Sequence, residues 1–282
     1  MISSIGEGTV IVGNRCKISP DVQIIFQRPS TVTIGDYCTL GAGVKIVCDG
    51  GDVRIGDWTS IHDRSLILST AGVVIGQHGW FGQNCVLDGT GGLTIGNGVR
   101  VGMYSQIWSH VAAGEQIEGC VLYGTRPVVL EDDVWLVGSC VVASGVTIGR
   151  KTIALITSNI TKSWPGDMVL AGSPAQPKDT LNFYTSISAD KKWEMLGEWL
   201  STISREHKLD MIVHDDFISL QDTTEYIIFV KDIRAEETAI RLFPNSTICT
   251  LSTKKYIKKL TDIEEKVLKV LSGNKARFLS RN

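Results

Sequence analysis

The chain has 282 residues, with 28 Lys and Arg against 30 Asp and Glu, which gives a formal net charge of −2 and a pI near 6.2. This balance excludes the broadly basic surface of nucleic-acid-binding proteins, and a hydrophobic share of 43% is enough for a sizeable core. We expect no transmembrane segment, because no stretch approaches the roughly 18 apolar residues that one requires. The first residues lack the basic region of a secretory signal.

The seven cysteines indicate a reducing compartment. Their number is odd and no two are spaced Cys-x-x-Cys, so they fit neither a disulfide framework nor a structural zinc site. Without a secretory signal, this pattern predicts a cytoplasmic protein.

Residues 1–177 carry a hexad repeat. Aliphatic residues recur every sixth position in groups of three, and 16 of the 18 positions hold Ile, Leu or Val. The position that follows is Gly in eight of the 18. The hexad positions are Ile34, Leu40, Ile46, Ile55, Ile61, Ile67, Ile75, Phe81, Leu87, Ile95, Val101, Ile107, Leu130, Leu136, Val142, Ile148, Ala154 and Ile160.

Three hexads make one coil of three short strands. The aliphatic residue of each hexad points inward, and we expect the small residue beside it to let the backbone turn at the corner. Successive coils then stack as parallel strands, so that each coil covers the inner row of the next. The pattern predicts a mainly β structure, a parallel β-helix, over residues 1–177.

Composition changes after residue 177. Of the 29 glycines, only Gly197 and Gly273 lie beyond it, and the charged residues become denser. Residues 189–208 and 262–271 have helical periodicity, and residues 211–214 and 226–230 read as strands. We therefore predict a second, small α/β domain over residues 178–282. It could cap the coil stack, join chains or hold an acceptor.

Two segments resemble a known family. Residues 128–136, Val-Val-Leu-Glu-Asp-Asp-Val-Trp-Leu, and the ending at 158–175, with Thr-Lys-Ser-Trp-Pro and Ala-Gly-Ser-Pro-Ala, are similar to hexapeptide-repeat acyltransferases. The similarity is greatest to the maltose/galactoside, xenobiotic and polysaccharide O-acetyltransferase branch. It implies a left-handed β-helix, acetyl-CoA as co-substrate, and a homotrimer whose active sites lie between chains.

His110 is the candidate general base. It ends the hexad 105–110 at the start of a long interruption of the array, the excursion loop 111–127. An imidazole with an ordinary pKa of about 6.5 can accept a hydroxyl proton near neutral pH, and long loops on rigid scaffolds often carry function. In the resembling family the catalytic His occupies this place.

The resemblance also implies residues that bind acetyl-CoA. Thr161 and Lys162 match the family's Thr-Lys pair, where the Lys can meet a phosphate as a point charge. Gly138 and Ile156 match positions whose backbone lies along the pantetheine arm. By hexad arithmetic, Asp88 and Trp108 lie one above the other near His110, where either could touch the acceptor or be solvated.

A metal centre is the weaker interpretation. The fold also resembles gamma-class carbonic anhydrases, which hold zinc with three His, but His62 and His78 occupy unlike hexad slots. We therefore expect no metal.

The sequence predicts an enzyme, an acetyl-CoA-dependent acetyltransferase that acts directly on a hydroxyl of a sugar or glycan. N-acetylation of an amino sugar, free or nucleotide-linked, is an alternative within the same apparatus. A non-catalytic β-helix scaffold is another, because Val137 and Leu155 stand where the family usually has Gly.

Overall fold

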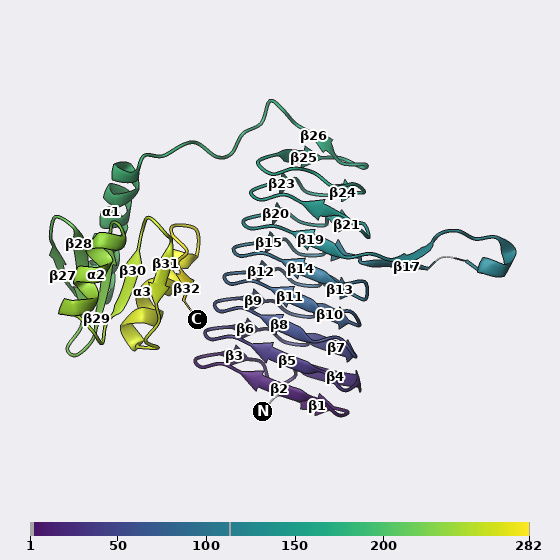
Figure 1. Ribbon diagram of the computed structural model, residues 1–282, viewed down its shortest axis with the longest axis horizontal. Helices are drawn as coiled ribbons and strands as arrows, with labels where there is room; N and C mark the ends of the chain where they lie inside the picture. The colour runs from purple at the N-terminus through teal and green to yellow at the C-terminus, as the bar shows by residue number, and fades with distance from the viewer. Residues whose placement is uncertain (1–2, 113, 282) are drawn as a thin grey trace. The chain divides into compact units, whose positions relative to one another are not determined.

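The computed structural model describes residues 3–112 and 114–281. Two compact units are present, Met1–Phe183 and Tyr184–Asn282. The first is a left-handed parallel β-helix, as predicted, and the second is a small α/β unit (Figure 1).

Over the described residues the β-helix has three sheets, and each coil up to β24 gives one strand to each of them. After β24 no further strand joins sheet B, and β26 pairs antiparallel with β25. Sheet A contains β1 (Ser3–Ile5), β4 (Gln23–Arg28), β7 (Lys45–Asp49), β10 (Leu66–Ser69), β13 (Val86–Gly89), β16 (Gln106–Ile107), β21 (Val141–Val142) and β24 (Asn159–Ile160). Sheet B contains β2 (Thr9–Val12), β5 (Thr31–Ile34), β8 (Val53–Ile55), β11 (Val73–Ile75), β14 (Leu93–Ile95), β19 (Val128–Leu130) and β22 (Thr147–Ile148). Sheet C contains β3 (Lys17–Ile18), β6 (Thr39–Leu40), β9 (Ser60–Ile61), β12 (Trp80–Phe81), β15 (Arg100–Val101), β20 (Trp135–Leu136), β23 (Ile153–Ala154), β25 (Val169–Ala171) and β26 (Gln176–Pro177).

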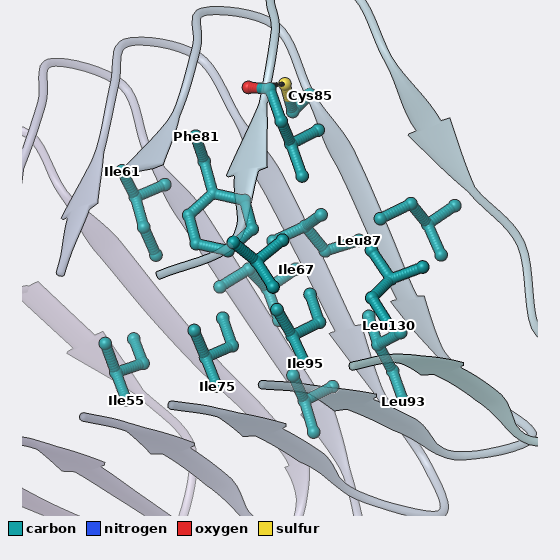
Figure 2. Packing of buried hydrophobic residues seen from close by; sticks show 14 of the residues in the cluster. Ile55, Ile61, Ile67, Ile75, Phe81, Cys85, Leu87, Leu93, Ile95 and Leu130 are labelled. Atoms are coloured by element: carbon teal, nitrogen blue, oxygen red, sulfur yellow. Dashed lines mark hydrogen bonds between the residues drawn. The ribbon is translucent and has the colours of Figure 1, made fainter. Parts of the chain in front are cut away.

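The hexad residues form the core of this unit. All 18 predicted inward positions are at most 3% exposed. The strand register stacks them in rows, such as Ile55, Ile75 and Ile95, which follow one another from left to right in Figure 2. Each fully buried aliphatic side chain contributes about 1.5–3 kcal/mol relative to an exposed one. The stack is therefore held together mainly by one continuous apolar interior.

The glycines beside the hexad residues serve close packing more than turning. The residues with left-handed backbone at the corners include Tyr37, Trp58 and His78, with φ near 60°. Gly56 and Gly76 lie instead against the next coil, where an added Cβ would come within 2.6 Å and 2.7 Å of its backbone carbon. The expectation that these glycines allow the turn is corrected: they let neighbouring coils approach.

The excursion loop forms a hairpin. β17 (His110–Ala112) pairs antiparallel with β18 (Tyr123–Thr125), and a short 3-10 helix, η1 (Gln116–Glu118), lies beyond them. The hairpin projects away from the coils (Figure 1). Its apolar side chains are open to solvent, with Ile117 89% and Val121 94% exposed.

Over residues 184–281, the second unit is a six-stranded sheet with three helices. The strands are, in spatial order, β27 (Asp210–Val213), β28 (Phe217–Gln221), β29 (Tyr226–Val230), β30 (Thr247–Thr250), β31 (Lys255–Ile257) and β32 (Leu279–Ser280). The helices are α1 (Ala189–His207), α2 (Ile233–Leu242) and α3 (Asp262–Ser272). The predicted helices at 189–208 and 262–271 are thus confirmed. None of the helices in the described ranges combines the length and apolar composition needed to cross a membrane.

Candidate active site

His110 lies where the chain leaves the β-helix. It follows β16 of sheet A and opens the excursion hairpin, opposite Thr125 in the antiparallel register. Its side chain is 35% exposed, so the ring is supported by protein on one side and open on the other.

Asp88 lies behind the imidazole ring. Its Oδ2 is 2.8 Å from Nδ1 of His110, and its side chain is fully buried. Asp88 lies in β13 of sheet A, and His110, 22 residues on, follows the neighbouring strand β16, so the β-helix stack itself sets this distance. Asp88 therefore meets His110 rather than open solvent.

Two hydroxyl residues complete the shell around Asp88. Oδ1 accepts hydrogen bonds from the backbone N–H and Oγ1 of Thr90, at 3.1 and 2.6 Å. Oδ2 accepts from the N–H and Oγ of Ser109, at 2.7 and 2.9 Å. Both oxygens are thus engaged by the protein.

These contacts keep Asp88 ionised. Burial raises the pKa of Asp88, but hydrogen bonds from Thr90, His110 and Ser109 outweigh burial and hold that pKa below its ordinary value. An ionised carboxylate only accepts, so Nδ1 of a neutral His110 carries the proton. The lone pair then lies on Nε2, which can accept a proton from a bound molecule.

Ser109 also stabilises the base of the hairpin through hydrogen bonds. Its carbonyl accepts from the N–H of Arg126 at 2.8 Å and from Oγ of Ser144 at 3.0 Å. Its Oγ accepts from the N–H of Gly91 at 2.8 Å. Ser109 and Thr90 were absent from the sequence prediction. The signal that could have found them is their place beside Asp88 and His110 in the hexad register.

Trp108 borders the same site. Its ring meets His110 edge to face, with centroids 6.0 Å apart, and its Nε1 donates to Oε1 of Gln106 at 3.1 Å. The structure therefore brings together His110, Asp88 and Trp108, although Asp88 is covered.

Gly138 and Ile156 lie on a different corner of the coil. Ser139 donates its N–H to Met103 in the preceding coil, and Thr157 donates to Gly138, so these corners stack. Ile156 is 62% exposed. A Cβ added at Gly138 would lie 3.7 Å from the Met103 carbonyl oxygen, an ordinary van der Waals contact. Met103 precedes His110 by seven residues, with β16 between them. Within one chain, this corner therefore precedes the strands of sheet A, and His110 follows one of them.

Thr161 and Lys162 are exposed at the end of the coil stack. Thr161 follows β24, two coils beyond Trp108 in sheet A, or about 10 Å. The Nζ of Lys162 lies 4.5 Å from the centroid of the Trp164 ring.

The two histidines considered for zinc lie in unlike surroundings. His62 packs beside Trp80, and His78 stacks on Trp58. Across residues 3–112 and 114–281, no group of three or more His, Cys, Asp or Glu is arranged to hold a metal ion.

Comparison with known proteins identifies relatives of the β-helix. The chain is 30% identical over 164 residues to WcaF of Escherichia coli K12, which is named provisionally as a colanic acid biosynthesis acetyltransferase. The match covers 58% of this chain and 65% of WcaF. It is 22% identical over 163 residues to galactoside O-acetyltransferase of Lactococcus lactis, covering 58% and 70%. The chain thus spans slightly less than two thirds of WcaF.

A solved structure is also similar. A hexapeptide-repeat-containing acetyltransferase from Vibrio cholerae, crystallised with acetyl-CoA, is 27% identical with a TM-score of 0.30, over 44% of this chain and 58% of that one. No protein-family model matches the chain. The sequence relatives confirm the predicted resemblance to hexapeptide-repeat acetyltransferases.

Proposed function

We propose that this chain, which resembles those acetyltransferases, transfers the acetyl group of acetyl-CoA to a hydroxyl of a sugar or glycan. The hydrogen bond between His110 and the buried, ionised Asp88 carries the proposal. It leaves Nε2 of His110 free to act as a general base on the open side of the ring. The names of the relatives, a colanic acid acetyltransferase and a galactoside O-acetyltransferase, support a saccharide acceptor.

The proposed reaction is one direct transfer. The acceptor hydroxyl gives its proton to Nε2 of His110 as its oxygen attacks the thioester carbonyl. When the tetrahedral intermediate collapses, the carbon–sulfur bond breaks and the imidazolium returns the proton to the CoA thiolate. Asp88 stabilises the transient positive charge on the ring. Ser109 is an unsuitable nucleophile, since it is fully buried and bonded to Asp88.

A homotrimer would complete the proposed site. Gly138 and Ile156 precede β21 and β24 of sheet A, whereas His110 follows β16 of the same sheet. Rotation about a threefold axis can set the His110 edge of one chain against the Gly138 corner of its neighbour. The exposed apolar hairpin, with Ile117 and Val121, supports docking between chains.

Lys162 completes the proposed donor site. Its ammonium group lies over the Trp164 ring at the exposed end of the coil stack, where it would meet a phosphate of acetyl-CoA beside Thr161. All seven cysteines are free thiols, which supports the cytoplasmic location that we propose.

A transfer assay tests the proposal. Purified protein is supplied with acetyl-CoA and a panel of sugars, amino sugars and alcohols, and CoA release is measured with a thiol reagent. We expect turnover with hydroxyl acceptors that depends on His110. Turnover with amines alone would contradict O-acetylation and favour the amino-sugar alternative. An absence of both acetyl-CoA binding and turnover would favour a scaffold.

A further inference from the structure

The second unit contains a cavity of its own. Its volume is about 440 Å³, within the range of small-molecule sites. The turn between β27 and β28 forms one wall and α2 forms the other. The lining residues are His214, Asp215, Asp216, Phe217, Arg234, Ala235, Thr238, Ala239 and Leu242.

Both walls are fixed by the fold. The N–H of His214 donates to the carbonyl of Phe217 at 2.9 Å, which closes the turn. Asp232 caps α2 by accepting from the N–H groups of Arg234 and Ala235. Phe217 and Ala239 belong to a small apolar cluster with Ile228, Val230 and Ile248. The cavity is therefore largely formed before any ligand arrives.

The charged side chains that line the cavity are available to a ligand. Within the part of the chain that the structure describes, Asp215, Asp216 and Arg234 make no side-chain hydrogen bond or ion pair. Two carboxylates disfavour an anionic ligand, and the guanidinium disfavours a cation. Together they offer acceptors and donors that suit neutral hydroxyl groups.

The cavity also has an apolar wall. The rings of His214 and Phe217 lie 4.1 Å apart with 30° between their planes, and Ala235 and Leu242 line the helix side. Aromatic and aliphatic surface of this kind suits the C–H face of a sugar ring, and the charged Asp216 and Arg234 line the same cavity.

We propose that this cavity binds a neutral sugar unit of the glycan that the β-helix acetylates. The choice of a saccharide rests on the proposed function, whereas the cavity and its chemistry do not. The second unit would then hold the acceptor, and a polymeric acceptor would gain affinity from two linked sites.

Histidine signals in a single NMR spectrum test this proposal on the full chain. Selective ¹³C labelling gives one imidazole signal for each of the five His, assigned with single-His variants. Methyl glycosides of glucose, galactose, mannose and N-acetylglucosamine are titrated without acetyl-CoA. We expect at least one of them to shift the His214 signal saturably. The His110 signal reports the proposed transferase site separately.

Matched variants identify the groups that bind. Arg234→Ala and Asp216→Asn should each weaken the His214 response about tenfold or more, as expected when a hydrogen bond to a charged group is lost. Arg241→Ala, on the same helix outside the cavity, should behave as wild type. This response should persist in His110→Ala even if that variant, or the wild type, transfers no acetyl group.

Three results would overturn the proposal. One is a His214 signal that no glycoside moves at high millimolar concentration. Another is an equal response in wild type and Arg234→Ala. The third is a His214 signal that inorganic phosphate moves and the glycosides do not, which would make the cavity an anion site. None of these results concerns acetyl transfer, so a failure of this proposal can be distinguished from a failure of the proposed function.

Discussion

Nδ1 of His110 lies 2.8 Å from Oδ2 of Asp88, a residue of the preceding coil that is wholly shielded from solvent. The pair joins the base of the excursion hairpin to a carboxylate that accepts four further hydrogen bonds. Orientation of the imidazole is therefore a property of the stacked coils, and the chemistry proposed for the site depends on it.

Replacement of His110 by Ala should abolish most turnover. A positioned general base contributes typically about 10²–10⁴-fold, so we expect a fall of that size in kcat. The measurement is CoA release with the best acceptor, and His207→Ala on α1 is the control. A variant that keeps more than about a tenth of wild-type turnover would show that His110 is not the base.

Asp88→Asn should impair turnover through the tautomer of His110. An amide NH₂ facing Nδ1 favours the proton on Nε2, which removes the base, and we expect kcat to fall by about 10²-fold or more with little change in KM. The pH–rate profile should also change, which a purely structural role would not predict. Asp63→Asn, whose carboxylate accepts from the N–H of Ala42 away from His110, is the matched control.

Asp88 should also make the stability of the fold depend on pH. Its pKa in the folded protein lies below the ordinary 3.8. The ionised carboxylate therefore stabilises the fold above that ordinary value, and this stabilisation is lost as pH falls through the lowered pKa. Urea unfolding followed by circular dichroism should show a higher free energy of unfolding for wild type than for Asp88→Asn at about pH 6. This difference should become smaller towards about pH 3. A difference that becomes larger in acid would contradict the assignment.

Lys162→Ala should weaken acetyl-CoA binding. Ligand at about 100 times its Kd stabilises a protein by about 2.7 kcal/mol, which a thermal-shift titration detects. We expect the variant to need more acetyl-CoA for the same shift in Tm, and Lys192→Ala on α1 to match wild type. Equal titration curves for Lys162→Ala and wild type would remove Lys162 from the proposed site.

Replacing a glycine that packs between coils with a larger residue should destabilise the β-helix. Gly76→Ala forces a Cβ to within 2.7 Å of the Gly96 carbonyl carbon, so we expect destabilisation of about 1–3 kcal/mol. Gly124→Ala, which meets nothing within 4 Å, is the matched control. Both are compared by urea unfolding. Similar stabilities for the two variants would refute the packing argument.

The hairpin tip should hold the proposed trimer together. Ile117→Ser with Val121→Ser removes its most exposed apolar surface, and sedimentation equilibrium should then show a lower mass than wild type. Val74→Ser, also an exposed valine but on sheet B, should leave the mass unchanged. A wild-type chain that sediments as a monomer would itself contradict the trimer.

The sequence alone determined the β-helix and its core, because one aliphatic residue per hexad must be buried for the coil to close. Ile55, Ile75 and Ile95 could be placed inside from spacing alone, and His110 could be singled out from the break in that spacing. The helical periodicity of residues 189–208 likewise sufficed for α1.

Only the tertiary structure decided how His110 is held. Asp88 looked like an outward-facing residue by hexad arithmetic, yet Thr90, Ser109 and His110 cover it, and such contacts depend on backbone positions at the coil corner. The cavity beside Arg234 was equally hidden, since β28 and α2 were not predicted. Burial and hydrogen bonding depend on which segments pack together in the folded chain, and a local sequence pattern does not specify those contacts.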